Sequence, residues 1–176
     1  KPDSILFGWD TIDNPTGGLL NGEYAMLVAR LGVGKSLIAV YLAQLWAKAG
    51  KRVLFIPCEM TLDQTIYRLD AFLGNFNPLV FRTKKRYGFE DETDSEELVL
   101  MFDNYYKLVE NELNRIKGFG GNIIFPKQGN YNTKNLKALI QEHKPDVTII
   151  DAVYLMADDD GMKGSDWKVL KNISNT

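Results

Sequence analysis

The sequence predicts an α/β fold: a parallel β-sheet in three layers, with helices covering both faces. Two observations carry this prediction. Short apolar runs alternate along the chain with longer amphipathic stretches, and a glycine-bearing loop joins the first apolar run to the first helix. With 176 residues, of which 45% are hydrophobic, the chain is long enough to bury one core. We therefore expect a single domain over residues 1–176.

The apolar runs predict strands over residues 24–28, 53–57, 122–125 and 147–151. Helical spacing of apolar residues predicts helices over about 36–49, 61–73, 95–117 and 133–143. Thr61 and Gln64 have the spacing of a capping box, and Gly50 stands where a helix C-terminus is expected. The side chains expected to face inward are Leu37, Val40, Tyr41 and Leu45, then Leu62, Ile66 and Leu69, then Leu98, Phe102, Tyr105, Leu108 and Leu113.

The joint between the first strand and the first helix has the pattern of a phosphate-binding loop. It differs from G-x-x-x-x-G-K-[ST] only in Ala29, which stands where the pattern has glycine. In such a loop, backbone N–H groups point at phosphate oxygens, and the dipole of the following helix adds to the attraction. Lys35 is expected to reach the β and γ phosphates, and the Ser36 hydroxyl to ligate Mg²⁺. The predicted nucleotide-binding residues are Ala29, Arg30, Leu31, Gly32, Val33, Gly34, Lys35, Ser36 and Leu37.

Two carboxylates are expected at the same edge of the sheet. Asp151 ends an apolar strand, so it is predicted to hold the Mg²⁺ shell through water; the alternative is a strand-end residue that caps a turn. Glu59 follows the strand that ends at Pro57. It suits a general base, and it equally suits a solvent-facing residue before the Thr61 cap. Spacing alone leaves both alternatives open for Glu59.

Composition sets further bounds. A formal net charge of -2 excludes an overall polycation but does not exclude contact with nucleic acid through a few loops. The single cysteine, Cys58, rules out an intrachain disulfide and fits a reducing cytosol. No apolar run approaches the roughly 20 residues that a membrane helix needs, and we expect no membrane partner. The chain begins at Lys1 and stops in a helix-like segment, so we expect it to be a piece of a longer protein.

Further motifs accompany the loop. They are Thr11-Ile-Asp13, Thr16-Gly-Gly-Leu19 and Gly22-Glu23, then Ala29-Arg30 with Gly34-Lys-Ser36, Cys58-Glu-Met60 with Gln64 and Arg68, and Ile150-Asp151 with Tyr154-Leu-Met156. Together they resemble the RecA-like ATPase core of the replicative hexameric helicases of the DnaB type, including phage relatives. That family commonly carries alanine where Ala29 stands. The resemblance covers most of the chain and is weaker over residues 76–120.

The resemblance implies more than the residues alone. It makes Glu59 the catalytic base, assigns Lys35 and Ser36 to phosphate and Mg²⁺, and places Asp151 in the metal shell. The implied cofactors are ATP, or another NTP, and Mg²⁺. The implied partners are single-stranded DNA, a homo-oligomeric ring that is hexameric in the full-length protein, and a primase or other replisome proteins. The implied location is the cytoplasm of a bacterium or of a phage-infected host cell.

Two departures from the family limit what is carried over. The family often shows a Tyr-Leu-Gln-Leu-type run after the aspartate, where this chain has Ala152-Val-Tyr154-Leu-Met156. The chain also stops at Thr176, before the strands that carry the family's γ-phosphate sensor, main DNA-binding loop and arginine finger. We expect the fold to be incomplete at the C-terminus, and this chain alone to hydrolyse ATP slowly and to unwind nothing.

Weaker features keep plainer alternatives. Arg82, Lys84, Lys85 and Arg86 suit a nucleic-acid backbone but also an ordinary solvated surface. Residues 158–161 lack the glutamate of a calcium loop and are predicted to be a mobile turn. Lys163, Trp167 and Lys168 suit contact with a DNA strand, or packing of the indole. His143 has no second histidine for a metal site, and Cys58 is predicted to be a small buried residue with no cationic neighbour to make it reactive.

Two functions from different classes remain. The first is an ATP-hydrolysing motor that translocates along DNA and unwinds it. The second is a nucleotide-switched RecA-like assembly factor or helicase loader, of RadA-like or clock-type ancestry, without unwinding activity. The Glu59-Met60 pair argues against the RadA-like and clock-type relatives.

Overall fold

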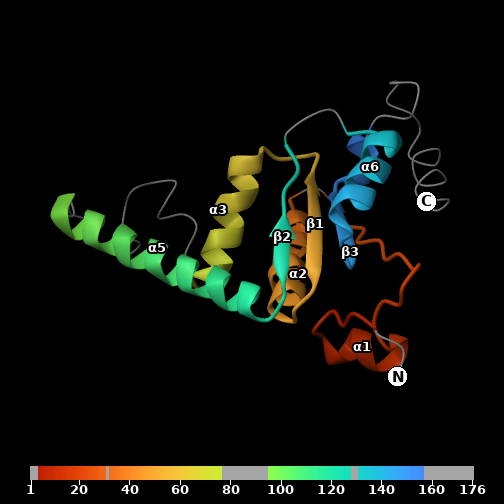
Figure 1. Ribbon diagram of the computed structural model, residues 1–176, viewed down its shortest axis with the longest axis horizontal. Helices are drawn as coiled ribbons and strands as arrows, with labels where there is room; N and C mark the ends of the chain where they lie inside the picture. Colours follow the sequence, from red (N-terminus) through yellow and green to blue (C-terminus); the bar gives the residue numbers. More distant parts are fainter. Residues whose placement is uncertain (1–3, 31, 77–94, 128–130, 157–176) are drawn as a thin grey trace.

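The computed structural model of the protein describes residues 4–30, 32–76, 95–127 and 131–156 (Figure 1). Its elements follow the predicted alternation of strands and helices from residue 35 to residue 151. In chain order they are α1 (Asp10–Thr16), α2 (Lys35–Lys48), β1 (Arg52–Pro57), α3 (Leu62–Leu73), α5 (Ser95–Gly118), β2 (Asn122–Ile124), α6 (Thr133–His143), β3 (Val147–Asp151) and a 3-10 turn, η1 (Val153–Leu155). The short helix α1 was not predicted.

The predicted parallel sheet is confirmed. Within the described ranges it has three strands in the order β2-β1-β3, and β1 pairs in parallel with both neighbours. The register sets Arg52 opposite Asn122 and Pro57 opposite Asp151. The carboxyl ends of β1 and β3 therefore lie side by side.

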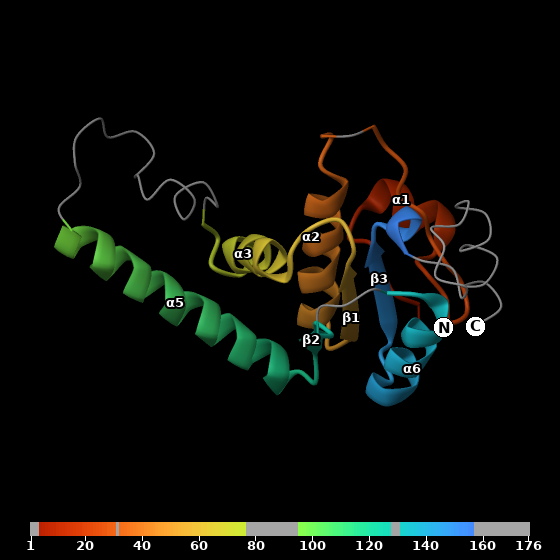
Figure 2. The same cartoon turned by 90° about the horizontal axis from the view of Figure 1, so that it is seen from above.

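Strand β1 is buried on both faces, as a central parallel strand requires. Val53 and Phe55 pack into the cluster formed with α2, α3 and α5. Leu54 and Ile56 point the other way and pack with Leu136 of α6. Because successive side chains of a strand alternate between faces, this division creates the predicted three layers, with α2, α3 and α5 on one face and α6 on the other (Figures 1 and 2).

Local hydrogen bonds explain where helix α3 begins. The predicted capping box is present at the start of α3: the N–H of Gln64 donates to Thr61 Oγ1 over 3.2 Å, and the N–H of Thr61 donates to Gln64 Oε1 over 3.3 Å. Helix α5 packs against α3 through the buried Tyr105, and its amino-terminal part extends away from the sheet (Figure 2). Among the predicted inward-facing residues whose side chains are described, Leu37 and Leu108 are instead exposed, at 44% and 52%. The side chain of Leu98 lies outside the described residues.

The strand predicted over residues 24–28 is wrong: the structure has irregular backbone there. Its side chains face solvent, with Tyr24 74% and Val28 79% exposed. An apolar run becomes a strand only when a neighbouring strand pairs with its backbone and a packed layer covers its side chains. Within the described residues, β3 pairs only with β1, and nothing pairs with residues 24–28. The apolar composition of residues 24–28 predicted a strand, but composition does not show whether a neighbouring strand is there to pair with it.

Hydrogen bonds hold the segment before this run in shape and join it to α2. The Asp13 carboxylate accepts hydrogen bonds from the N–H groups of Phe7, Gly8 and Trp9. The Trp46 indole of α2 donates to the carbonyl of Leu6. Asp13 of the Thr11-Ile-Asp13 motif thus holds the turn before α1 in shape. In the described part of the chain, no helix combines the length and apolar character needed to cross a membrane.

Candidate nucleotide-binding site

The carboxyl ends of β1 and β3 are tied together through one carbonyl group. The carbonyl oxygen of Asp151 accepts hydrogen bonds from the N–H of Cys58 over 2.6 Å and from the N–H of Glu59 over 3.0 Å. This extends the pairing beyond the last register pair, Pro57 and Asp151. The main chains of Glu59 and Asp151 are therefore held against each other at this edge of the sheet.

The glycine-bearing loop turns into α2 at Gly34, which is the N-cap of that helix at φ 103° and ψ 21°. Gly32 also has a positive φ, 77°. These values lie in the left-handed region, which disfavours residues with a Cβ. Ala29 is not among the non-glycine residues of the described chain that adopt a positive φ. A Cβ at position 29 is therefore compatible with this loop.

Lys35 folds back over the loop that precedes it. Its Nζ donates to the carbonyl of Ala29 over 3.0 Å and to the carbonyl of Arg30 over 3.1 Å. The ammonium group thus sits beside the backbone of the predicted phosphate loop, at the first turn of α2. The role of Lys35 and of this loop toward phosphate stays a prediction.

Asp151 is the buried charge of this site, at 5% exposure. Burial raises the pKa of its carboxyl, a hydrogen bond from the Ser36 side chain lowers it, the Glu59 charge raises it, and the charges of Arg68 and Lys35 lower it. The Oδ2 atom is buried and has no hydrogen-bond partner among the described residues. A buried carboxylate oxygen is normally satisfied by a polar partner such as a water molecule or an ion, and a hydroxyl beside a carboxylate is an oxygen donor set that suits Mg²⁺.

Ser36 and Asp151 therefore fit the metal assigned to them on this observation. They do not form a complete cage, because no cluster of three or more His, Cys, Asp or Glu in the described ranges is placed to hold a metal ion. Mg²⁺ usually keeps several waters and takes its other ligands from substrate phosphates. A site with few protein ligands is what that chemistry requires.

Glu59 extends from the strand end into solvent, and its side chain meets Tyr154. The Tyr154 hydroxyl donates to Glu59 Oε2 over 3.4 Å. The structure thus gathers Lys35, Ser36, Glu59 and Asp151 at one edge, from the loop, α2 and two strand ends. Their catalytic and binding roles stay predictions.

Sequence reasoning missed two members of this site. Arg68 was quoted as part of a motif without a role, yet its charge acts on Asp151 from α3. Tyr154 was quoted in the motif that follows Asp151, and again in a departure from the family pattern, without a role, yet it contacts Glu59. In each case the available signal was the residue's position inside a quoted motif.

Among the described residues, neither Cys58 nor His143 belongs to a group of three or more candidate metal ligands. Cys58 is half-buried, and burial, followed by the Asp151 charge, raises the pKa of its thiol to about 12. The raised pKa fits the predicted lack of an activated thiol, but the side chain is not fully buried as predicted. His143 ends α6, where its carbonyl accepts from the Arg52 guanidinium.

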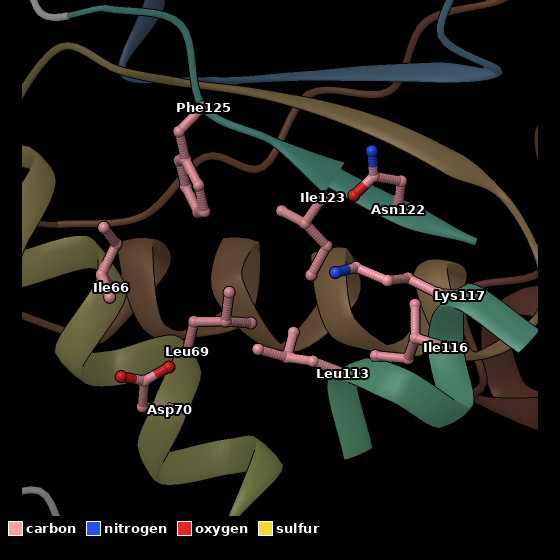
Figure 3. A pocket seen from close by; sticks show the side chains of 9 residues that line it. All are labelled: Ile66, Leu69, Asp70, Leu113, Ile116, Lys117, Asn122, Ile123 and Phe125. Carbon is pink, nitrogen blue, oxygen red and sulfur yellow. The ribbon is translucent and has the colours of Figure 1, made fainter. Parts of the chain in front are cut away.

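An apolar hollow of about 220 Å³ lies elsewhere, between α3, α5 and β2 (Figure 3). Asp70 of α3 and Lys117 of α5 line it, and burial raises the pKa of the Asp70 carboxyl. None of the residues around it is among the predicted site residues. The basic run from Arg82 to Arg86, residues 158–161, and Lys163, Trp167 and Lys168 lie outside the described residues, as does Leu31 of the loop.

A parallel sheet between two helical layers, with the glycine loop opening α2 and acidic residues at the strand ends, is an α/β arrangement of the kind found in RecA-like proteins. The family model described as the DnaB-like helicase C terminal domain matches residues 4–176. The chain belongs to this family. Among curated proteins, no match to the chain is found.

Proposed function

We propose that this chain is the ATP-hydrolysing core of a DnaB-type replicative helicase. It binds ATP, or another NTP, with Mg²⁺ and uses hydrolysis to move along single-stranded DNA as part of a homo-oligomeric ring in the cytoplasm. Membership of the DnaB-like helicase family supports this proposal. The observation that carries it is the convergence of Ser36, Glu59 and Lys35 on the buried Asp151.

Phosphate binding falls to the loop over residues 29–37. Lys35 already donates to two loop carbonyls, so phosphate oxygens can take over these bonds without a large movement of the ammonium group. The unsatisfied N–H groups at the start of α2 add donors, and the helix dipole favours negative charge there. The triphosphate would therefore lie across the first turn of α2.

Ser36 and Asp151 would hold Mg²⁺, Ser36 directly and Asp151 through water. When bound, the ion neutralises charge on the β and γ phosphates. The buried Oδ2 of Asp151 has no hydrogen-bond partner in the described chain, and the metal's water shell would supply one. Mg²⁺ in such sites commonly keeps several of its waters.

Glu59 would act as the general base. A water oxygen attacks the γ-phosphorus, the bond from that phosphorus to the β–γ bridging oxygen breaks, and Glu59 accepts the proton of the water. ADP and inorganic phosphate result. The fixed main chain of Glu59 at the strand end supports this role, because a base must be held close to its water.

Substitution of Glu59 by Gln tests the proposal on the full-length, assembled protein. Gln keeps the size of the side chain and cannot take a proton, so we expect a loss of turnover of about 10²–10⁴-fold with binding of a non-hydrolysable ATP analogue retained. Glu110→Gln, at an exposed position of α5, is the matched control and should turn over normally.

DNA dependence separates the two classes of function. A motor should lose single-stranded-DNA-stimulated turnover in Glu59→Gln. A nucleotide switch should keep nucleotide-dependent affinity for its protein partner and show no DNA stimulation in the unsubstituted protein. Unchanged turnover in Glu59→Gln would contradict the catalytic assignment.

A further inference from the structure

Tyr154 stands in the turn that directly follows β3, where its hydroxyl meets the side chain of Glu59. We propose that Tyr154 is a positioning residue: it orients the Glu59 carboxylate for proton transfer without touching the nucleotide. This inference rests on the proposed function, because it assigns Tyr154 to the base of that same reaction.

The contact is built from two elements distant in sequence. Glu59 follows β1 and Tyr154 follows β3, and they are 95 positions apart in the chain. The phenol oxygen lies 3.4 Å from Glu59 Oε2, at the long end of hydrogen-bond distances. Hydrogen bonds of catalytic groups are often long before substrate binds and shorten when the reacting complex forms. A phenol hydroxyl can donate to a carboxylate, and a carboxylate can only accept.

The turn itself holds Tyr154 in place. In a 3-10 helix residues three apart share a side, so Val153 and Met156 lie on the same side of η1. Both belong to the cluster on the α6 face of the sheet, where Met156 is fully buried. Tyr154 falls between these two anchors and points to a different side. The residue remains 40% exposed at the surface of the site.

Glu59 thus has two restraints with different targets. Its main-chain N–H donates to the Asp151 carbonyl, and this bond restrains the position of the backbone. Its carboxylate accepts from the Tyr154 hydroxyl, and this bond restrains the orientation of the side chain. An exposed glutamate side chain samples several rotamers on its own. If its rotamers are restricted before the reaction, less conformational entropy is lost on reaching the transition state. With Oε2 engaged by the phenol, Oε1 is the oxygen we expect to face the water.

Tyr154→Phe tests the inference, because it removes the hydroxyl and keeps the ring. On the full-length, assembled protein we expect kcat to fall about threefold to tenfold, as for the loss of one long, solvent-exposed hydrogen bond, with KM for ATP and analogue affinity unchanged. Tyr106→Phe on α5, an exposed tyrosine on another element, is the matched control and should leave both parameters unchanged.

A double-mutant cycle with Glu59→Gln isolates the route of the effect. If Tyr154 acts through Glu59, adding Tyr154→Phe to Glu59→Gln produces no further loss in single-turnover rate. An equal loss in both backgrounds, an unchanged kcat, or a raised KM alone would each overturn the positioning role. Normal turnover in Glu59→Gln would refute the proposed function itself, whereas a silent Tyr154→Phe beside an inactive Glu59→Gln would refute only this inference.

Discussion

The backbone N–H of Glu59 donates to the carbonyl oxygen of Asp151 over 3.0 Å. This bond joins the two carboxylate-bearing residues of the site through their main chains, just beyond the point where β1 and β3 stop pairing. A shift of either strand would move both residues together. The sheet therefore sets the distance between the main chains of the proposed base and the proposed metal ligand. The conformations of the two side chains then determine where the carboxylates lie.

Replacement of Gly34 by a residue with a Cβ is predicted to strain the backbone of the loop. Its φ of 103° lies in the left-handed region, while the space that a Cβ would enter is open, with Leu37 Cβ nearest at 4.0 Å. Gly34→Ala should therefore act through backbone strain, lowering the free energy of unfolding by about 1–2 kcal/mol. It should also weaken nucleotide binding, since the turn into α2 must change. Urea unfolding and a nucleotide titration measure the two effects.

The control for that substitution is Gly118→Ala. Gly118 ends α5, nothing lies within 4 Å of the added Cβ, and it is not among the glycines with positive φ. Alanine should be neutral there or stabilising by up to about 1 kcal/mol. Equal destabilisation by both substitutions would argue against strain at Gly34.

Helix α5 offers a comparison between two aliphatic residues. Ile116 is 2% exposed and packs in the cluster with α2, whereas Leu108 faces solvent. Ile116→Ala should lower the free energy of unfolding by about 2–5 kcal/mol through lost burial and a cavity. Leu108→Ala should change it by less than about 0.5 kcal/mol. Chemical denaturation of the two variants measures the difference, and a large cost at Leu108 would mean that this face is covered.

The Cys58 thiol should be slow to react in the folded protein. Its pKa is raised to about 12, chiefly by burial and then by the Asp151 charge, so at pH 8 the folded state holds the neutral thiol. The thiolate is the reactive form, so labelling with iodoacetamide at pH 8 should be much slower in buffer than in urea. Asp151→Asn, which removes the neighbouring charge, should speed the folded-state reaction. Fast labelling of the folded chain would contradict the burial of this side chain.

Much of the fold followed from sequence because the relevant signals are local. The capping box at Thr61 and Gln64 placed the start of α3 to the residue, and the apolar run ending in Asp151 placed β3. Residues 24–28 show the limit. Their apolar composition suits a strand, but a strand exists only through its neighbours, and in the described residues they have none. The predictions that Leu37 and Leu108 face inward were wrong for a similar reason, because helical spacing does not show which part of a helix face is covered by other elements.

The candidate site divides in the same way. Lys35 and Ser36 could be predicted because one short motif holds them, and Asp151 because it ends a strand. The contact between Tyr154 and Glu59 joins positions 95 apart, and it depends on a 3-10 turn anchored by Met156. No local pattern encodes such a contact. The influence of Arg68 on Asp151 across the site is hidden in the same way.

Binding of a non-hydrolysable ATP analogue to the 176-residue chain, with and without Mg²⁺, tests the central claim most directly. Wild-type chain should bind in a Mg²⁺-dependent manner. Lys35→Ala should weaken binding about 10–100-fold, because hydrogen bonds to charged groups contribute about 1.5–3 kcal/mol. Lys107→Ala, at an exposed position of α5, should bind like the wild type. Equal affinity of the Lys35→Ala and wild-type chains would contradict the assignment of the loop as the nucleotide site.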